Sequence, residues 1–366
     1  MTVEIESAGR VAMYNDHALK LGVFSSNCSQ GRIATSVPES WSGDWADNLA
    51  LARFADAAGI DFLLPVGRWK GYGGDPDHMG ASFETITWAA GLLAATTRLT
   101  VFGTVHVPLF HPLIAAKQMV TADHIGHGRF GLNIVCGWNE GEFAMFGVDA
   151  KDHAARYRQG QEWIDVVRRA WTDDDFDFAG EFYTLHGVRE KPKPYGGSLP
   201  IILNAGSSGD GRAFALRNCD AWFTTSADGI AAAKAEAAAH GRALGAYTAG
   251  IVVCRPAHDE AVAYHQYATF EHANWGAIDN TLRMKGLDKL PPADVERHRR
   301  AFANGHGGTL LIGTPDEVAE KLAGLHGAGF SGVAISFVND GAELPYFVQE
   351  VLPRLERLGL RRPQGR

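Results

Sequence analysis

The sequence predicts an α/β fold of the (β/α)8 TIM-barrel type, with an inserted excursion before the last strand. Short apolar runs typical of strands alternate along the chain with longer amphipathic runs typical of helices. The strand-like runs number eight, and eight parallel strands close a barrel. The competing architecture is a doubly wound open sheet, which normally carries a GxGxxG turn after its first strand. Ser25 to Gln30 read SSNCSQ instead, so the barrel is favoured.

The first half of the chain supplies four of these strands and the helical runs between them. The apolar positions of the first helical run recur at about 3.6-residue spacing, and Gly59 ends that run. The expected strands are Lys20 to Phe24, Asp61 to Pro65, Arg98 to Thr104 and Arg129 to Val135. The expected helices are Trp45 to Ala58, about Phe83 to Ala95, and Leu113 to Ile125.

The second half supplies the other four strands, each followed by helical sequence. They are expected at Leu199 to Asn204, Ala221 to Thr224, Ala249 to Cys254 and Gly332 to Phe337. The stretch 274–308 breaks the rhythm with two prolines, a basic cluster and a glycine-rich end. Long insertions at the active face of a barrel often serve as lids. We therefore expect one barrel domain over residues 1–366, with a lid or insertion at about 274–308.

Composition and charge exclude several classes of protein. The net charge of −8 disfavours a chain whose main role is to bind nucleic acid or an anionic membrane. The first residues are charged, and no run approaches the ~18 apolar residues of a membrane helix, so we expect a soluble cytoplasmic protein. Cysteines 28, 136, 219 and 254 are scattered without CxxC or histidine partners. Free, mostly buried thiols are expected, with neither disulfides nor a metal site.

Polar residues at strand ends are the candidates for chemistry, because barrel active sites lie there. Thr104 closes the third strand, Asn133 lies within the apolar fourth strand, and Glu142 follows on its loop. A buried amide needs a hydrogen-bonding partner, so Asn133 is either a satisfied core residue or part of a site. A threonine at a strand end, such as Thr104, is more often an ordinary strand former than a catalytic group. His106 is either an acid or base, or a packed structural residue.

Two segments have the composition of an anion site. Arg156 and Tyr157 begin a long helix, and Asn204 to Ser208 (NAGSS) lead from the fifth strand into another helix. Small residues let the backbone approach a ligand, free N–H groups point at it, and arginine adds a charge-assisted pair. The alternative for Ser207 and Ser208 is simple N-capping.

An ordered series of motifs resembles the luciferase-like flavin monooxygenases. Within that superfamily the chain is most similar to the branch with the pyrimidine, dimethylsulfone and alkanesulfonate monooxygenases. The similarity covers roughly Leu21 to Phe223, and GTPDEV from Gly313 recurs late in the chain as in many members. The motifs are GRWKGYGG from Gly67, AAKQMVTADHIGHGRFGLN from Ala115, GWNEGEFAMFG from Gly137, EFYTLHG from Glu181, KPKP from Lys191 and NAGSS from Asn204.

The resemblance implies a role for each aligned residue. The implied cofactor is reduced FMN, with O2 as co-substrate. Thr104 and Asn133 match a small polar pocket in which oxygen meets the reduced flavin, and His106 is kept as a further catalytic candidate. The implied flavin-binding residues are Gly67 and Arg68 on the loop after the second strand, Asn133 and Glu142 at the ring edge, and Arg156, Tyr157, Ser207 and Ser208 at the phosphate.

The implied activity is a two-component monooxygenase supplied with reduced FMN by an NAD(P)H-dependent flavin reductase. It would oxygenate and cleave either an N-heterocyclic amide such as a pyrimidine or a C–S bond of a sulfone or sulfonate. The substrate chamber would include Trp138, His106, His111 and the 274–308 insertion. This chain departs from the pyrimidine enzymes at Arg68, where they carry lysine, and around Asn27 to Ile33 and Cys136. A buried arginine would favour a sulfonate, and a neutral pocket an amide or sulfone.

Other interpretations stay open. A deazaflavin-dependent oxidoreductase of the same superfamily would not need the oxygen pocket, and a non-catalytic flavin-binding relative would have lost it. A metal-dependent barrel hydrolase would need paired histidines, whereas the 15 here are dispersed. The cluster Arg297 to Arg300 is either a clamp for an anion or a solvated helix face. We expect a homodimer or tetramer, with Ile86, Trp88, Leu92 and Leu93 either at the contact or in the core.

Overall fold

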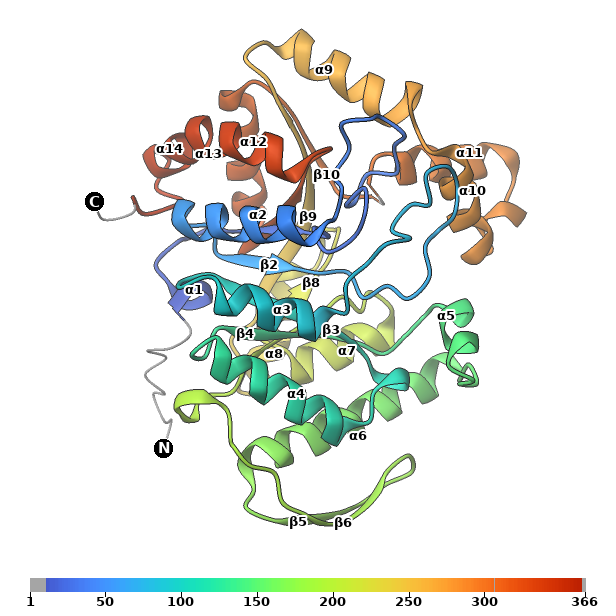
Figure 1. The fold of residues 1–366 in the computed structure, drawn as a ribbon, viewed down its shortest axis with the longest axis vertical. Helices are drawn as coiled ribbons and strands as arrows, with labels where there is room; N and C mark the ends of the chain where they lie inside the picture. Colours follow the sequence, from blue (N-terminus) through green and yellow to red (C-terminus); the bar gives the residue numbers. More distant parts are fainter. Residues whose placement is uncertain (1–10, 306, 364–366) are drawn as a thin grey trace. The chain divides into compact units, whose positions relative to one another are not determined.

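The fold is a closed barrel of eight parallel strands with helices, which confirms the predicted fold class (Figure 1). The computed structural model describes residues 11–305 and 307–363. The barrel strands are β1 (Lys20–Phe24), β2 (Phe62–Leu64), β3 (Thr100–His106), β4 (Phe130–Val135), β7 (Ile201–Asn204), β8 (Ala221–Phe223), β9 (Gly245–Cys254) and β11 (Gly332–Ser336). The order β9-β11-β1-β2-β3-β4-β7-β8 is closed by a pairing of β9 with β8, and β10 (Thr309–Gly313) adds to β9.

The helices connect these strands largely as the periodicity predicts. The helices are α1 (Val11–Tyr14), α2 (Trp45–Ala58), α3 (Thr85–Ala94), α4 (Pro112–Ile125), α5 (Glu140–Met145), α6 (His153–Thr172), α7 (Gly209–Asn218), α8 (Ile230–Ala239), α9 (His258–Gln266), α10 (Trp275–Met284), α11 (Pro292–Ala303), α12 (Pro315–Gly327), α13 (Asp340–Glu350) and α14 (Leu352–Arg357). The helix expected at 45–58 has those bounds, and Gly59 ends it in the left-handed conformation, where glycine has no side-chain clash.

The chain divides into two compact units. Among the described residues, the first unit comprises 11–15, 84–224 and 229–246, and the second comprises 16–83, 225–228, 247–305 and 307–363. The first unit holds β3, β4, β7 and β8 with α3 to α8, and the second holds β1, β2, β10, β11, most of β9 and the remaining long helices. The expectation of a single domain over the whole chain stays a prediction.

In the first unit, α3 packs its apolar face inside the unit. Ile86, Trp88, Leu92 and Leu93 are each no more than 4% exposed. They belong to the core of one chain, because α3 packs on β3 and α4. The suggestion that these four side chains form a contact between subunits is therefore wrong.

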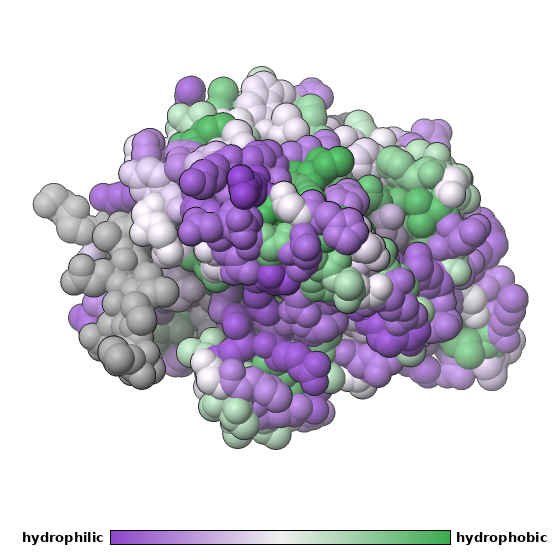
Figure 2. All heavy atoms as spheres, turned by 90° about the horizontal axis from the view of Figure 1, so that it is seen from below, coloured by the Kyte–Doolittle hydropathy of each residue, from purple (hydrophilic) through white to green (hydrophobic). Residues whose placement is uncertain are grey.

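A short antiparallel hairpin follows α6 and was not predicted as strands. Its strands are β5 (Phe176–Ala179) and β6 (Thr184–Val188), and the turn between them is fixed by the Glu162 carboxylate of α6, which accepts three backbone N–H bonds. Most of its side chains are exposed or half-buried, so the sequence lacks the strong apolar alternation of a core strand. Figure 2 views the molecule from the side on which the hairpin lies in Figure 1, and that face is mostly hydrophilic.

In the second unit, the insertion at 274–308 contains two helices, α10 and α11, and is bonded to loops of the same unit. The Asn274 N–H donates to the Ala34 carbonyl, 2.9 Å away, and Thr35 forms a bridge with Ala273. The Asn280 side chain donates to the Tyr72 carbonyl at 2.8 Å. These bonds hold the insertion to the loops that follow β1 and β2. Its role as a lid stays a prediction.

The basic cluster in α11 is a paired helix surface. Arg297 pairs with Asp294, and Arg299 bonds both oxygens of Asp279 at 2.7 and 3.2 Å. Arg300 lies over the ring of Phe270. Because these guanidinium groups already have carboxylate or aromatic partners, the clamp interpretation loses its basis, and the solvated helix face is the better description.

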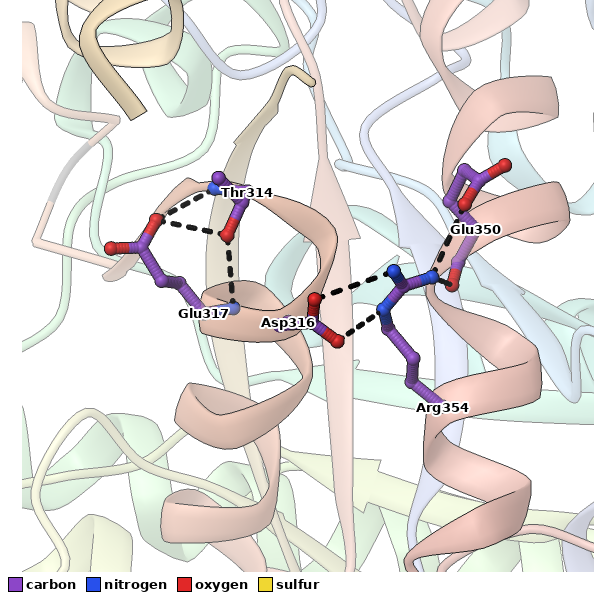
Figure 3. Close-up of polar contacts among 5 residues, drawn as sticks. All are labelled: Thr314, Asp316, Glu317, Glu350 and Arg354. Atoms are coloured by element: carbon purple, nitrogen blue, oxygen red, sulfur yellow. Dashed lines mark hydrogen bonds and ion pairs between the residues drawn. The ribbon is translucent and has the colours of Figure 1, made fainter. Parts of the chain in front are cut away.

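The GTPDEV motif forms the junction of β10 and α12 (Figure 3). Thr314 and Glu317 form a reciprocal capping box: the Thr314 hydroxyl accepts from the Glu317 N–H, and the Glu317 carboxylate accepts from the Thr314 N–H at 2.7 Å. The backbone N–H of Thr314 and a contact with His258 lower the pKa of Glu317 to about 2. On the same helix, the Asp316 carboxylate accepts hydrogen bonds from Nε and Nη2 of Arg354.

Thr314→Ala is expected to lower the free energy of unfolding by about 1 kcal/mol, because it leaves a helix N–H without its cap. Urea denaturation of the two proteins measures the difference. Thr314→Ser keeps the hydroxyl and serves as the control, which should stay close to the wild type. Equal midpoints for the alanine and serine variants would show that the capping box does not stabilise the fold.

Burial of Asp340 at the start of α13 makes it a pH-sensitive group. Its side chain is 1% exposed, one oxygen accepts from the Phe337 N–H at 3.1 Å, and the other has no partner among the described residues. Burial raises the pKa of this carboxyl from 3.8 to about 8. Between these values the folded chain keeps a proton that the unfolded chain has lost, so stability falls as the pH rises.

Asp340→Asn should therefore stabilise the protein at pH 8 relative to the wild type by up to a few kcal/mol, since each pKa unit corresponds to about 1.4 kcal/mol. The gain should shrink as the pH falls below 3.8, where the carboxyl becomes protonated in the unfolded chain as well as in the folded one. Unfolding curves of both proteins at a series of pH values measure this gap. A gap that does not change with pH would contradict the assignment.

Two observations bear on the expectations about cysteines and membrane helices. All four cysteines are free and buried, as predicted. In the described part of the chain, no helix combines the length and apolar character needed to cross a membrane.

Candidate functional site

Two polar side chains meet inside the first unit, on neighbouring strands. β3 and β4 pair in parallel with Thr104 opposite Asn133, so both side chains project from the same level of the sheet. Thr104 is 5% exposed and Asn133 8%. The Asn133 amide donates to the Thr104 hydroxyl at 3.0 Å. The pair predicted from the two strands is therefore brought together, although β3 continues to His106 and Thr104 lies within it.

Asn133 is only half satisfied. Its Oδ1 atom is buried and has no hydrogen-bond partner among the described residues. A buried polar atom without a partner costs about 1–3 kcal/mol, so it marks a place where a ligand donor belongs. The alternative of a fully satisfied core amide does not hold for this residue.

The neighbouring candidates for a substrate chamber differ in character. His106 is the last residue of β3 and is buried at 5% exposure, whereas it was expected on the following loop. His111 caps α4, because its Nδ1 accepts from the Leu113 N–H, and it is exposed. That is a structural role. Trp138 follows β4 and is half-buried.

The loop after β4 holds a second group of buried polar atoms. Glu142 on α5 is 1% exposed, and Asn139 just before it is 4% exposed with no partner for its Nδ2 atom among the described residues. The Arg156 guanidinium donates to the Gly137 carbonyl at 2.7 Å, while its Nε is buried without a partner. Gly137 has a φ of +92°, and a Cβ there would lie 2.4 Å from Phe143, so glycine is required.

The NAGSS segment forms a narrow cradle at the start of α7. Asn204 Oδ1 accepts from the Gly206 N–H at 2.7 Å, and the Ser208 hydroxyl caps the helix by accepting from the Gly211 N–H. A Cβ on Gly206 would lie 2.6 Å from the backbone of Gly211. Only glycine permits this close approach of the two backbone segments.

Tyr157 borders the same cradle from α6. A Cβ on Gly211 would lie 2.5 Å from the Tyr157 hydroxyl and 3.0 Å from the Ser208 hydroxyl, so both groups border the first turn of α7. Burial raises the pKa of Tyr157, so its hydroxyl stays protonated and can donate. A 320 Å³ cavity beside it is lined by Tyr157, Arg158, Asp210, Phe214 and Arg217, among others. The N–H groups at the start of α7, the Tyr157 phenol and the Arg156 guanidinium are together suited to binding a phosphate.

The capping interpretation and the anion-site interpretation of the serines are compatible. Ser208 is the N-cap of α7, and its position still presents the first turn of that helix to a ligand. Ser207, immediately before it, is exposed. The sequence-predicted residues Thr104, Asn133, Glu142, Arg156, Tyr157, Ser207 and Ser208 all lie in the first unit.

Gly67 and Arg68 lie in the second unit, on the loop after β2. Gly67 is buried, and Arg68 is 8% exposed with its guanidinium 4.7 Å from the ring centre of Tyr72. The Arg68 carbonyl accepts from the Ser82 hydroxyl at 2.8 Å, which fixes the loop. The contact of Gly67 and Arg68 with flavin stays a prediction.

Sequence reasoning missed several buried polar groups, among them Asn139, Gln159 and Arg32. Asn139 and Gln159 in the first unit, and Arg32 in the second, each carry a buried side-chain atom without a partner in the described part of the chain. Asn139 lies inside the quoted GWNEGEF motif, which could have indicated it. Gln159 stands in no quoted motif, and Arg32 lies in the stretch Asn27 to Ile33, where this chain departs from the pyrimidine enzymes.

Comparison with known proteins gives consistent results for most of the chain. The family described as luciferase-like monooxygenase matches residues 19–332. The FMNH(2)-dependent dimethylsulfone monooxygenase of Pseudomonas fluorescens (strain Pf0-1) is 32% identical over 362 residues, covering 94% of this chain and 96% of that protein. Pyrimidine monooxygenase RutA of Escherichia coli (strain K12) is 30% identical over 361 residues, covering 92% of both chains.

Solved structures share the fold at lower identity. Long-chain alkane monooxygenase (LadA) superposes with a TM-score of 0.84 at 19% identity, covering 96% of this chain and 94% of that one. Riboflavin lyase (RcaE), solved with modified FMN and riboflavin, gives a TM-score of 0.81 at 24% identity, covering 93% and 92%. At these identities the likeness bears on the fold alone.

Proposed function

The chain belongs to the luciferase-like monooxygenase family, and from that premise we propose that it is a two-component monooxygenase acting on a small organic substrate. Its cofactor is reduced FMN, and O2 is its co-substrate. The observation that carries this proposal is the Thr104–Asn133 pair, in which a buried amide oxygen is left for a ligand. The dimethylsulfone relative is named as FMNH(2)-dependent, which supports the choice of cofactor.

The residues of the first unit fit FMN. The phosphate would lie at the start of α7, bound by backbone N–H groups beside Ser207 and Ser208, by the Tyr157 hydroxyl and by Arg156, whose Nε has no protein partner among the described residues. Asn133 and Glu142 would bind the edge of the ring. Gly67 and Arg68 are proposed as further flavin contacts on the strength of the GRWKGYGG motif.

Reduced FMN supplies the electrons that activate oxygen, and the chain supplies orientation and a polar environment. Asn133 Oδ1 is a hydrogen-bond acceptor, so it would orient an N–H group of the bound cofactor. The Thr104 hydroxyl accepts from Asn133, and its own O–H group would be available to donate a hydrogen bond to a negatively charged reactant. His106 is buried at the end of β3, the strand that also carries Thr104. It is a further candidate for a group that transfers a proton.

Several finer features belong to the same proposal. An NAD(P)H-dependent flavin reductase would deliver the reduced cofactor, and the insertion at 274–308 would cover the substrate. The substrate is a pyrimidine-like amide, or a sulfone or sulfonate whose C–S bond is cleaved. A cytoplasmic location and a homodimer or tetramer complete the proposal.

The test is to mix the purified protein anaerobically with reduced FMN and then admit oxygen. Flavin absorbance and product formation are followed with and without uracil-like amides, sulfones and alkanesulfonates. Reoxidation coupled to cleavage of one substrate class is the expected result. If reduced FMN does not bind, or no substrate changes its reoxidation, the proposal fails and a deazaflavin-dependent reductase becomes the next candidate.

A further inference from the structure

Arg32, on the loop after β1 in the second unit, has a guanidinium group without a hydrogen-bond partner among the described residues. The side chain is half-buried, lies over the ring of Phe24 at 4.6 Å, and makes no hydrogen bond to any described residue. Its Nε atom is fully buried. A guanidinium carries five N–H donors, so this arrangement leaves a strong donor group available to a ligand.

The electrostatic surroundings of Arg32 are not acidic. Burial lowers the pKa of Arg32 to about 10, and the phenol of Tyr72 is the one described group that opposes this. Arg32 therefore stays charged at neutral pH without a carboxylate partner in the described part of the chain. By contrast, two other arginines of the second unit have carboxylate partners: Arg255 pairs with Glu343 at 2.8 Å and Arg361 with Asp61 at 2.6 Å.

The buried histidine His78 is affected by the positive charges of both Arg32 and Arg68. His78 is 1% exposed and its Nδ1 lies 3.2 Å from the Gln30 amide oxygen. Burial, followed by the charges of Arg68 and Arg32, lowers the pKa of His78 to about 3, so the ring is neutral at physiological pH. Its stacking on Tyr72, with ring centres 5.9 Å apart, places a polar aromatic pair beside the two arginines.

The insertion adds a further cation to this region. The residue that caps the end of α10, Lys285, has its pKa lowered by burial and then by the charge of Arg68. The Asn280–Tyr72 bond ties the same helix to the loop that carries Arg68 and His78. Concentrating like charges in a partly buried region costs free energy unless an anion offsets them.

We propose that Arg32 binds the anionic group of the substrate, a sulfonate, sulfinate or carboxylate. This assignment rests on the proposed monooxygenase function and narrows it: the chain acts on a small organic anion, whereas the substrates named for its two relatives are an uncharged sulfone and pyrimidines. Arg32 is a binding residue that sets specificity, and Phe24 holds its guanidinium plane in position.

The test measures anion binding in the absence of flavin. Calorimetric titrations compare methanesulfonate, methanesulfinate and acetate with the neutral compounds dimethylsulfone and uracil. The wild type should bind at least one anion, and Arg32→Gln should weaken that binding at least 10-fold, as expected for loss of a charge-assisted bond. Arg297→Gln removes the same charge from an exposed, paired arginine and should bind as the wild type does.

Thermal stability separates this role from a merely structural one. Without ligand, Arg32→Gln should melt at the same temperature as the wild type or higher, because it relieves uncompensated charge. The bound anion should raise the melting temperature of the wild type and of Arg297→Gln but not of Arg32→Gln. Arg32→Lys, which keeps the charge but loses the planar fork, should bind the anion with intermediate affinity.

Three results would overturn the inference. One is that no anion binds the wild type, and another is that Arg32→Gln binds anions as well as the wild type while melting at a lower temperature. The third is that FMN and inorganic phosphate compete with the anion but riboflavin does not, which would assign Arg32 to the cofactor phosphate. Binding of reduced FMN is measured separately, so failure of the anion site is distinguishable from failure of the proposed function.

Discussion

Asn133→Ala is expected to lower the rate of substrate oxygenation about 100-fold while the protein still binds FMN. The substitution removes both the amide that donates to Thr104 at 3.0 Å and the buried oxygen left without a partner in the described structure. Loss of one preorganised polar group where charge develops typically costs a factor of about 100 or more. The phosphate cradle on α7 is untouched, so FMN affinity should change only a few-fold.

The measurement is kcat for product formation, together with FMN affinity by fluorescence quenching. Thr104→Ala and Thr104→Ser test the other member of the pair. Alanine should reduce kcat strongly, and serine, which keeps the hydroxyl, should recover most of it. Asn133→Ala with full activity, or a serine variant no better than alanine, would remove this pair from the mechanism.

Gly206→Ala is expected to abolish FMN binding at micromolar concentrations. The added methyl group would lie 2.6 Å from the carbonyl of Gly211, so the two backbone segments of the cradle must separate. The N–H groups at the start of α7 would then no longer point to one position, and the phosphate would lose its site. Riboflavin, which has no phosphate, should bind the wild type more weakly than FMN and should discriminate less between the two proteins.

The chain offers a matched control three residues away. Gly209 is the first residue of α7, and a Cβ there would meet no atom within 4 Å. Gly209→Ala should bind FMN normally, and its helix should be slightly more stable, since alanine is favoured over glycine in a helix by roughly 0.5–1 kcal/mol. Circular dichroism of both variants establishes that they are folded. Equal FMN affinity of Gly206→Ala and Gly209→Ala would place the phosphate elsewhere.

The eight barrel strands were predictable from the sequence because each is short, apolar and flanked by helical periodicity. The boundaries of the strands were harder to predict. For example, β3 runs two residues past Thr104 to His106, because a buried strand end has no local stop signal in the sequence. The β5–β6 hairpin was missed because its side chains are largely exposed, so no alternating apolar pattern marks it. The apolar face of α3 was ambiguous because core residues and interface residues have the same composition.

The candidate site, like the fold, was predictable from the sequence only in part. The sequence by itself determined the family and the residue types of the site, because the motifs around Asn133, Arg156 and Asn204 are local and ordered along the chain. Only the tertiary structure decided that Asn133 reaches Thr104 while its oxygen has no partner among the described residues. It also decided that arginines of α11 are paired, whereas Arg32 has no partner in the same part of the chain. Those distinctions depend on partners distant in sequence, and the satisfaction of a polar group is a property of its three-dimensional surroundings.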